Sequence, residues 1–212
     1  MEPHAWDERY VEGTQEALPW DTGEPASELV DYFRSRGSVP ARALEIGCGT
    51  GTNAIWMANQ GVQVVATDVA PQAIAMANEK AKKAGVTGVQ FVVEDILQKN
   101  AVPPESADFV FDRGVFHVMD PGSRSTFAMR VAEALADGGM WLCLAGCADE
   151  VRENMNEGPP QLKAQEVIDV VEKYFEVHKL ERATFKIPNG KQYLCWIVLM
   201  RKRPEDTRSR FE

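Results

Sequence analysis

The stretch LEIGCGTGTN, at residues 44–53, decides how this chain is expected to fold. A short apolar run, Ala43–Ile46, enters a turn with a glycine at every second position, at Gly47, Gly49 and Gly51, and a helical pattern follows. Glycines let the backbone turn tightly and approach a ligand closely. The start of a helix offers free N–H groups at the positive end of its dipole. A strand, a glycine turn and a helix in this order predict a ligand-binding loop.

Outward from this loop, apolar runs alternate with helical patterns along most of the chain. Strands are expected at Ala43–Ile46, Val62–Thr67, Val89–Val93, Asp108–Phe111 and Met140–Ala145. Helices are expected at Pro25–Arg36, Thr52–Gln60, Pro71–Ala84, Ser123–Ala136 and Lys163–Tyr174. Two more extended runs, Glu176–Ile187 and Lys191–Met200, flank Pro188-Asn189-Gly190, and Asn-Gly between such runs is a hairpin signal. The expected fold is therefore α/β: a doubly wound, Rossmann-like, mostly parallel seven-stranded sheet that ends in an antiparallel hairpin.

Length and composition indicate one domain with two flanking segments. A chain of 212 residues, 44% hydrophobic and 26% charged, suits a single buried core. Residues 1–24 are polar and aromatic, and we expect them to form an N-terminal arm or lid. Residues 25–202 carry the strand and helix patterns and form the expected domain. The charged tail, residues 203–212, is expected to fray.

Charge and hydropathy argue against several classes of function. The net charge of -9 disfavours a nucleic-acid partner, because phosphate binding needs clustered Lys and Arg. No apolar run reaches the ~20 residues that span a bilayer, and the first residues lack the basic and apolar regions of a secretory signal. We therefore expect a cytoplasmic location and no membrane partner. The 4 cysteines form no CxxC pair, so no metal site is expected.

The spacing of the glycines separates two kinds of nucleotide-binding loop. The dinucleotide fingerprint is G-x-G-x-x-G. Counted from Gly47, its third glycine would fall at position 52, where this chain has Thr52. The pattern is instead G-x-G-x-G, with the acidic Glu45 two positions before the first glycine. This spacing disfavours a nicotinamide oxidoreductase.

The segment EIGCGTG, at residues 45–51, resembles the class I methyltransferases. In that family the glycine loop cradles S-adenosylmethionine. The resemblance in this and the following motifs runs from about Ala43 to Ala145. It implies that the loop and its flanks bind this cofactor through Glu45, Gly47, Gly49, Gly51, Thr52 and Asn53.

Two further acidic positions fit the same cofactor. Asp68 follows the expected strand Val62–Thr67, and both Asp68 and Val69 are expected to contact the cofactor. A carboxylate at this place can accept hydrogen bonds from the ribose hydroxyls. The alternative role of Asp68 is to cap the helix that begins at Pro71. The family resemblance implies that Asp95 meets the adenine amino group and that Ile96 packs on the adenine ring.

The reaction centre is expected after the fourth strand, at the segment DRGVFH. Ligands of open α/β sheets sit outside the carboxyl ends of the strands, so Asp112, Arg113 and His117 should face the methyl group. We expect all three to be catalytic and Asp112 also to contact the cofactor. His117 is a candidate base or a group that orients the acceptor; the alternative is a histidine satisfied by packing.

A narrower resemblance involves the N-terminal arm. The pattern W-x-x-x-Y at residues 6–10, the segment PWDTGEP at residues 19–25 and DRG at residues 112–114 resemble the thiopurine and thiol methyltransferase-like group. The resemblance implies that the arm folds over the cofactor and that Trp20 packs near its methionine end; the alternative is that the aromatic residues only anchor the arm to the core. The loop Asp149–Gln161 is expected to complete the acceptor pocket, since long loops are often lids.

The expected function is methyl transfer from S-adenosylmethionine to a small molecule, with S-adenosylhomocysteine as the product. A soft nucleophile such as a thiol is favoured, because a thiolate needs little more than alignment. Two alternatives stay open: a protein lysine or other N- or O-methyltransferase on the same fold, and a cofactor-binding module without turnover. The acceptor atom and the oligomeric state are not determined by the sequence.

Overall fold

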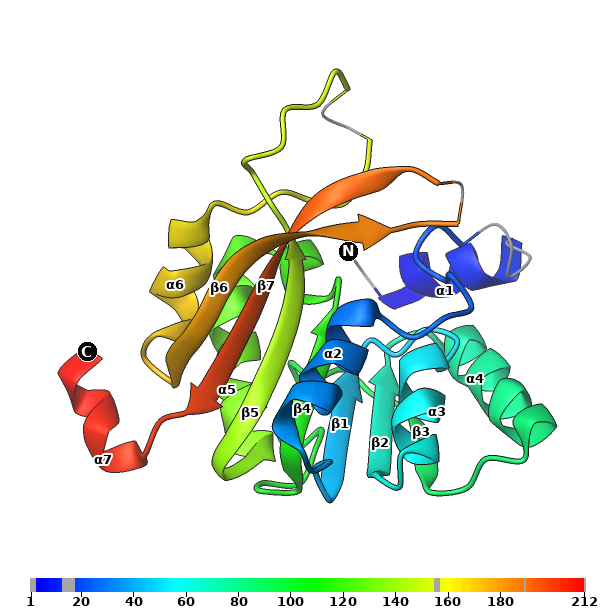
Figure 1. Cartoon of the computed structure of the whole chain (residues 1–212), viewed down its shortest axis with the longest axis horizontal. Helices are drawn as coiled ribbons and strands as arrows, with labels where there is room; N and C mark the ends of the chain where they lie inside the picture. The colour runs from blue at the N-terminus through cyan, green and yellow to red at the C-terminus, as the bar shows by residue number, and fades with distance from the viewer. Residues whose placement is uncertain (1–2, 13–17, 155–156, 189, 212) are drawn as a thin grey trace.

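One mixed sheet forms the centre of the computed structural model, which describes residues 3–12, 18–154, 157–188 and 190–211 (Figure 1). The strands are β1 Arg42–Ile46, β2 Gln63–Asp68, β3 Val89–Val93, β4 Ala107–Arg113, β5 Leu135–Gly146, β6 Phe175–Lys186 and β7 Gln192–Lys202. The strands lie in the order β3-β2-β1-β4-β5-β7-β6. Neighbours from β3 to β5 pair in parallel, whereas β7 pairs antiparallel with both β5 and β6. The predicted fold class is confirmed, although Asn189 of the hairpin turn lies outside the described residues.

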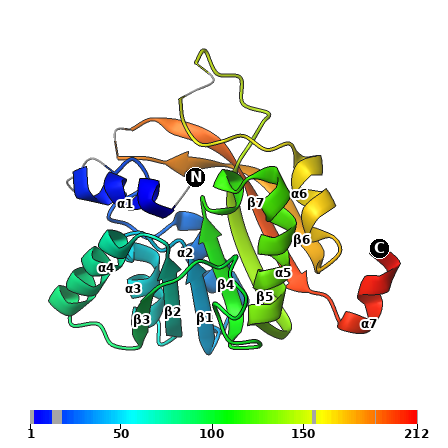
Figure 2. The ribbon, with the colours of Figure 1, turned by 180° about the vertical axis from the view of Figure 1, so that it is seen from behind.

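Helices cover both faces of this sheet. The α-helices are α1 Pro3–Glu12, α2 Ser27–Arg36, α3 Thr52–Asn59, α4 Pro71–Ala84, α5 Arg124–Ala134, α6 Ala164–Val171 and α7 Glu205–Arg208. On one face, α2, α3 and α4 pack apolar side chains against the sheet. On the other face, seen in Figure 2, α5 and α6 bury a second apolar cluster around Trp141. Burial of these two faces supplies most of the driving force for folding.

Three parts of the chain differ from the sequence expectation. The helix expected at Ser123–Ala136 ends at Ala134, because Leu135 is fully buried and pairs with Ala107 in the sheet. The N-terminal arm contains a helix, α1, that its sequence pattern did not predict. The tail that we expected to fray forms α7 and a 3-10 helix, Ser209–Phe211, and Arg203 stacks on Phe211. In each case tertiary contacts override a weak local preference.

The strand order reverses between β1 and β4. From the centre of the sheet, β1, β2 and β3 follow one another toward one edge, and β4 and β5 follow one another toward the opposite edge. Chains that leave the two central strands diverge there and open a crevice at their carboxyl ends. The glycine loop after β1 and the segment after β4 meet at this point, since a Cβ on Gly47 would lie 2.1 Å from Cγ2 of Val115. The fold thus brings the two predicted site segments together.

No helix among the described parts of the chain combines the length and the apolar character that a bilayer crossing requires.

Candidate active site

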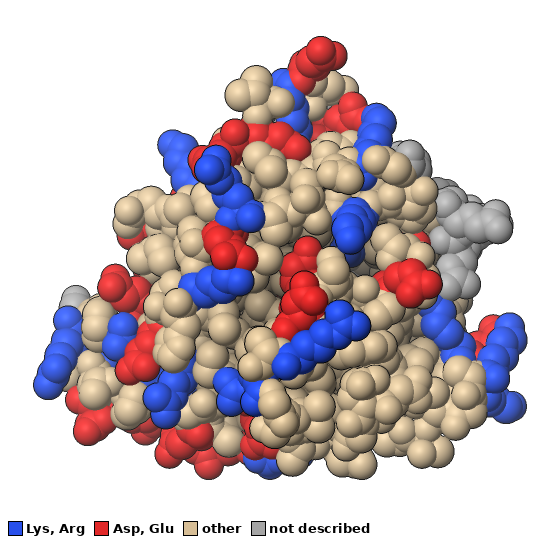
Figure 3. Space-filling model, viewed as in Figure 1, with Lys and Arg blue, Asp and Glu red and all other residues tan. Residues whose placement is uncertain are grey.

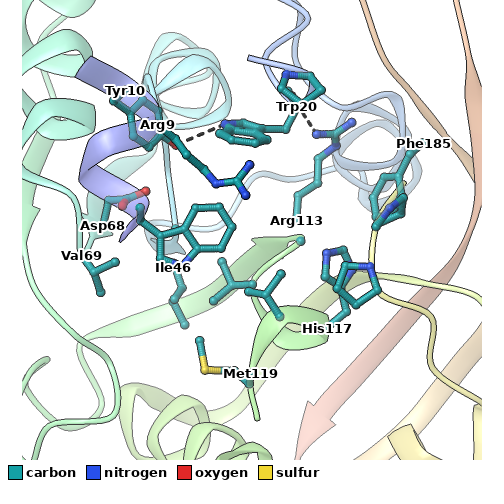
Figure 4. Close-up of a pocket in the computed structure, with 18 of the residues that line it drawn as sticks. Arg9, Tyr10, Trp20, Ile46, Asp68, Val69, Arg113, His117, Met119 and Phe185 are labelled. Atoms are coloured by element: carbon teal, nitrogen blue, oxygen red, sulfur yellow. Dashed lines mark hydrogen bonds between the residues drawn. The ribbon is translucent and has the colours of Figure 1, made fainter. Parts of the chain in front are cut away.

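A cavity of about 530 Å³ lies at the carboxyl ends of the parallel strands. The arm closes it on one side and the β6–β7 hairpin with the loop before α6 on another (Figure 4). The predicted residues that line it are Trp20, Gly47, Asp68, Val69, Asp95, Ile96, Arg113 and His117. The arm, the segment after β4 and the loop Asp149–Gln161 also contribute to the wall as expected, through Trp6, Arg9, Tyr10, Val115 and Pro159. The lining residues that we did not predict include Met119, Phe185 and Tyr193. Most of the expected site is therefore assembled around one space.

The three glycines of the loop have different roles. All three have positive φ, at 65° for Gly47, 53° for Gly49 and 80° for Gly51, a region that side chains other than glycine rarely adopt. Gly47 lines the cavity, and Gly49 lies beneath the hydroxyl of Tyr10. A Cβ on Gly51 would meet Phe91 at 2.8 Å and Ala77 at 2.9 Å, and Gly51 lines neither this cavity nor the one behind the glycine loop; its expected contact with the cofactor stays a prediction. Gly51 is needed for packing of α3 against the sheet.

Behind the glycine loop lies a second cavity of about 400 Å³, and Glu45 lines it. Asn53 donates from Nδ2 to Oε1 of Glu45 at 3.0 Å and accepts the backbone N–H of Ala26 at 2.9 Å. The other oxygen, Oε2, has no hydrogen-bond partner among the described residues, although Glu45 is only 2% exposed. Burial raises the pKa of Glu45 to about 8, against the lowering effect of Asn53. A buried acceptor without a partner is suited to a ligand donor such as an ammonium group.

Replacing Glu45 with Gln should therefore flatten the pH dependence of stability in the ligand-free protein. The folded pKa lies above the unfolded value near ~4.3, so folding favours the neutral carboxyl. The contribution of the neutral Glu45 carboxyl to stability is complete below the unfolded-state pKa and is lost as the pH rises through about 8. The advantage of Glu45→Gln over wild type should grow between pH 5 and pH 8, by at most about 1.4 kcal/mol per pH unit.

Urea unfolding at several pH values measures this difference. The control is Glu133→Gln, at an exposed position on α5, whose free energy of unfolding should follow the wild-type pH profile. Parallel curves for Glu45→Gln and wild type would show that Glu45 is ionised without cost in the folded protein.

Asp68 supports the glycine loop from the end of β2. Its Oδ2 accepts the backbone N–H of Gly49 at 2.9 Å, and its Oδ1 accepts the N–H of Ala70 at 3.0 Å. The carboxylate also lines the main cavity beside Val69. Asp68 therefore holds the glycine loop and the turn before α4, but α4 has Ala70 at its N-cap and no side-chain cap hydrogen bond, so the capping alternative is wrong. The predicted contact with a ribose stays a prediction.

Asp95 and Ile96 follow β3 at the same side of the cavity. Asp95 accepts the backbone N–H of Leu97 at 3.0 Å, which holds the turn after the strand. Ile96 is buried and offers an apolar wall. A carboxylate next to an apolar wall matches the chemistry of an aminopurine ring, and the contact itself stays a prediction.

Asp112 is placed differently from our expectation. It is fully buried and does not line the cavity. Its Oδ1 accepts the N–H groups of Val115 at 2.8 Å and of Phe116 at 3.1 Å. Burial raises the pKa of this carboxyl to about 6. Asp112 therefore holds the segment after β4 through its Oδ1, while its buried Oδ2 has no hydrogen-bond partner among the described residues. Its contact with the cofactor stays a prediction.

Arg113 joins three parts of the site. Its guanidinium donates to the carbonyl of Trp20 at 3.0 Å and to the carbonyl of Lys186 at 3.2 Å, and it stacks over the ring of Phe185 at 5.1 Å. These contacts connect β4 to the arm and to the end of β6. Arg113 lines the cavity as expected (Figure 4), and its charge is paired there with carbonyl dipoles.

His117 lies in a 3-10 helix, η2 Phe116–Val118, and lines the cavity beside Phe185. Its Nδ1 accepts the backbone N–H of Gly146 at 2.8 Å. Desolvation, followed by the charges of three arginines, lowers the pKa of His117 to about 3. These features oppose the role of a general base, which must accept a proton near neutral pH.

Aromatic packing holds the arm, as in the alternative role that we considered for these side chains. The indole N–H of Trp20 donates to the hydroxyl of Tyr10 at 3.2 Å, and both rings meet edge to face. Trp6 contacts Trp20 in the same way. This cluster, with Leu18, packs on Ala70 and Ala73 at the start of α4. The W-x-x-x-Y spacing was the one signal for it.

Polar contacts also fasten the arm to the glycine loop. The hydroxyls of Thr50 and Thr52 donate to the carboxylate of Asp21. Lys80 from α4 donates to both threonines, at 2.6 and 2.9 Å, and lies 3.5 Å from Asp21. Thr52, which we expected at the cofactor, is therefore directed to the arm. The attachment predicts that the arm and the loop move together.

The fold and the site together define a class I S-adenosylmethionine-dependent methyltransferase. A glycine loop, two carboxylates at successive strand ends and an apolar wall border one crevice at the reversal of strand order. The sequence model of the family "Thiopurine S-methyltransferase (TPMT)" matches residues 1–200. The chain belongs to the thiopurine S-methyltransferase family.

Several curated relatives carry related activities in their names. A 2-heptyl-1-hydroxyquinolin-4(1H)-one methyltransferase of Mycobacteroides abscessus is 28% identical, over 78% of this chain and 71% of its own length. A probable thiol methyltransferase 2 of Arabidopsis thaliana is 31% identical, over 73% of this chain and 65% of its own length. Thiocyanate methyltransferase 1 of the same plant is 32% identical, over 68% and 62%. The chain thus spans just under two thirds of the two plant relatives.

Solved structures share the fold. A structure described as "Conversion of a Disulfide Bond into a Thioacetal Group during Echinomycin Biosynthesis" has a TM-score of 0.83 and 21% identity, covering 98% of this chain and 94% of that one. The N-methyltransferase NodS of Bradyrhizobium japonicum, in complex with S-adenosylhomocysteine, has a TM-score of 0.73 and 17% identity, covering 96% and 100%.

Proposed function

We propose that this enzyme methylates a small molecule at a soft nucleophile, with a thiol as the favoured acceptor. The observation that carries the proposal is the main cavity, which is enclosed by the arm and the hairpin and is walled largely by apolar and aromatic side chains. A methyl transfer to a thiolate needs alignment and a dry pocket more than a proton acceptor. The names of the thiol and thiocyanate methyltransferases among the relatives support it.

The residues present fit S-adenosylmethionine. Asp68 and Asp95 would face its polar adenosine groups and Ile96 would pack on the base. The unpartnered oxygen of Glu45, at the second cavity, would accept a hydrogen bond from its ammonium group. When bound, the cofactor supplies a methyl group that is already activated on a sulfonium. The protein then positions the acceptor and excludes water.

A protein lysine substrate is the second candidate, and the charges at the cavity disfavour it. An ammonium acceptor would suit an acidic channel. Two arginines, Arg9 and Arg113, line the cavity together with four acidic residues, Asp68, Glu94, Asp95 and Glu157. Asp68, Glu94 and Asp95 follow β2 and β3, where the adenosine part of the cofactor would bind, and Glu157 is paired with Lys191. The charge next to His117 is that of Arg113. On the face drawn in Figure 3, acidic and basic side chains are interspersed and form no basic stripe for a nucleic acid. A small anionic or neutral acceptor agrees better with this distribution.

The cofactor assignment predicts which ligands stabilise the fold. S-adenosylmethionine or S-adenosylhomocysteine, at ~100 times its dissociation constant, should add about 2.7 kcal/mol to the free energy of unfolding. NAD should add nothing, because the loop lacks the third glycine of the dinucleotide fingerprint. A thermal-shift assay measures both. Stabilisation by NAD, without a response to either S-adenosyl ligand, contradicts the assignment.

The acceptor class is tested with a panel of thiols, amines and hydroxyl compounds. Release of S-adenosylhomocysteine is the readout, and the thiols are expected to give the highest kcat/KM. A panel in which an amine or an alcohol is the best substrate overturns the thiol proposal while leaving the methyltransferase class intact.

A further inference from the structure

We propose that His117 is a fixed hydrogen-bond donor to an ionised acceptor atom, so that the acceptor subsite selects thiolates and other anionic nucleophiles. This rests on the methyl transfer proposed above. It replaces the general base that the sequence suggested with a group that stabilises the anion. The argument depends on which ring nitrogen of His117 carries the proton.

The backbone of β5 sets the tautomer of His117. The N–H of Gly146 donates to Nδ1 at 2.8 Å. A nitrogen that accepts a hydrogen bond carries no proton, so the proton of the neutral ring is on Nε2. In this state Nε2–H can donate to a ligand and cannot accept a proton from it.

Gly146 is itself held firmly. Its carbonyl accepts the N–H of Leu162 at 2.9 Å, and it pairs with Cys195 of β7. A Cβ on Gly146 would lie 2.1 Å from the carbonyl oxygen of Pro160, so the chain passes too closely for any other residue. The N–H that selects the tautomer is therefore fixed by the sheet.

The surroundings of His117 keep the ring neutral. Arg113 approaches from β4, Arg124 from α5 and Arg152 from the loop after β5, and desolvation and these charges lower the pKa of His117 to about 3. The ring is 6% exposed. The carboxylate of that loop at the cavity is Glu157, which is paired with Lys191. Asp112 points its Oδ1 to backbone N–H groups beneath the segment.

The same cationic surroundings favour an anion in the acceptor position. Arg113 and His117 border the same part of the cavity (Figure 4). The hydrogen bonds of Arg113 there go to carbonyl groups, and its acidic neighbours Asp21, Glu28 and Glu45 line the second cavity. A neutral N–H donor and a guanidinium beside an apolar wall stabilise a thiolate in a site with little water.

Ionisation precedes the transfer in this scheme. The acceptor thiol gives its proton to water and enters as the thiolate. Its sulfur forms the bond to the methyl carbon, and the bond from that carbon to the sulfonium sulfur breaks, with its electron pair left on that sulfur. One negative and one positive charge disappear, so both reacting sulfur atoms are neutral in the products, and no protein group changes its protonation state.

A donor to the nucleophile is useful when the acceptor is largely protonated at the working pH. Lowering the thiol pKa by one unit raises the thiolate fraction tenfold. The accompanying loss of nucleophilicity is smaller, because the Brønsted coefficient of thiolates, measured in disulfide exchange, is about 0.4–0.5. Acceptors that are already ionised gain little. The effect of His117 should therefore increase with the pKa of the acceptor.

Two substitutions separate donation from basicity. In His117→Asn, the side-chain oxygen can still accept the N–H of Gly146, but no group reaches the place of Nε2. In His117→Gln, the longer amide can place its NH₂ near that position, and an amide has no basic nitrogen. We measure kcat/KM against pH for wild type and both variants, with a series of thiols whose pKa values bracket the assay pH.

For His117→Asn we expect kcat/KM to fall by about 10- to 100-fold with high-pKa thiols, the range of a lost hydrogen bond to a charged group, and by less with thiols that are already ionised. His117→Gln should recover most of this loss. The pH range over which kcat/KM rises should follow the pKa of each thiol in all three proteins. The proposal is overturned if the rise of kcat/KM with pH has the same midpoint for every thiol and disappears in both variants. It is also overturned if the loss of kcat/KM is the same for every thiol.

Failure of the fold or of the proposed function is visible separately. Stabilisation by S-adenosylhomocysteine in a thermal-shift assay reports whether each variant folds and binds the cofactor product, and it should be equal in the three proteins. A wild-type protein that binds S-adenosylhomocysteine but methylates no compound in the panel contradicts the proposed function. If the enzyme methylates compounds of the panel but the midpoint of its pH profile does not change with the thiol, only the proposed role of His117 is contradicted.

Discussion

Deleting residues 1–20 should lower turnover by at least ~100-fold while leaving the sheet folded, since small errors in alignment cost that much in displacement reactions. The deletion removes Trp6, Arg9, Tyr10 and Trp20 from the wall of the cavity. It also removes the carbonyl of Trp20, one of the two to which Arg113 donates. The two main apolar clusters contain no residue of the arm, so the core should keep its stability.

Single-turnover kinetics with the best acceptor, combined with urea unfolding, test this prediction. The control is deletion of residues 205–212, which contain α7 and lie outside the cavity, and it should leave turnover unchanged. An arm-deleted enzyme that keeps its wild-type rate would show that the arm is not a lid. If the free energy of unfolding falls by as much as the activation free energy rises, the arm contributes to folding of the core instead.

Gly47→Ala should lower both the free energy of unfolding and the affinity for S-adenosylhomocysteine. At φ 65° a side chain costs about 1–2 kcal/mol. The new Cβ would also lie 2.1 Å from Cγ2 of Val115, and overpacking of this kind costs a further ~1–3 kcal/mol. Relief of the clash requires the glycine loop and the segment after β4 to separate, which alters the crevice between β1 and β4.

Gly85→Ala provides the matched control. Gly85 caps α4 at the same φ of 65°, and a Cβ there meets nothing within 4 Å. Its variant should show the backbone cost alone, with unchanged ligand affinity. Urea unfolding and calorimetric titration measure the two quantities. If both variants lose the same stability and bind S-adenosylhomocysteine equally well, the contact between the two segments is not what makes Gly47 necessary.

The sequence by itself determined the fold class and the location of the site. Alternation of strands and helices is a repeated local signal, and the G-x-G-x-G spacing with Glu45 distinguishes this loop from a dinucleotide loop. The order of parallel strands then brings Asp68, Ile96 and His117 to one edge, because every strand of a parallel sheet ends at that edge. These properties depend on residue type and spacing along the chain.

Only the tertiary structure decided what each polar group does. Asp112 and His117 are five residues apart on one segment. Backbone N–H groups of Val115 and Phe116 hold Oδ1 of Asp112, which does not line the cavity, whereas a backbone N–H from β5 occupies Nδ1 of His117, which does line it. In the same way, the hydroxyl of Thr52 donates to Asp21 of the arm because packing brings that carboxylate within hydrogen-bond distance. Such partners are distant in sequence, and a buried polar group takes whichever partner the packing brings within hydrogen-bond distance. No pattern along the chain reports that distance.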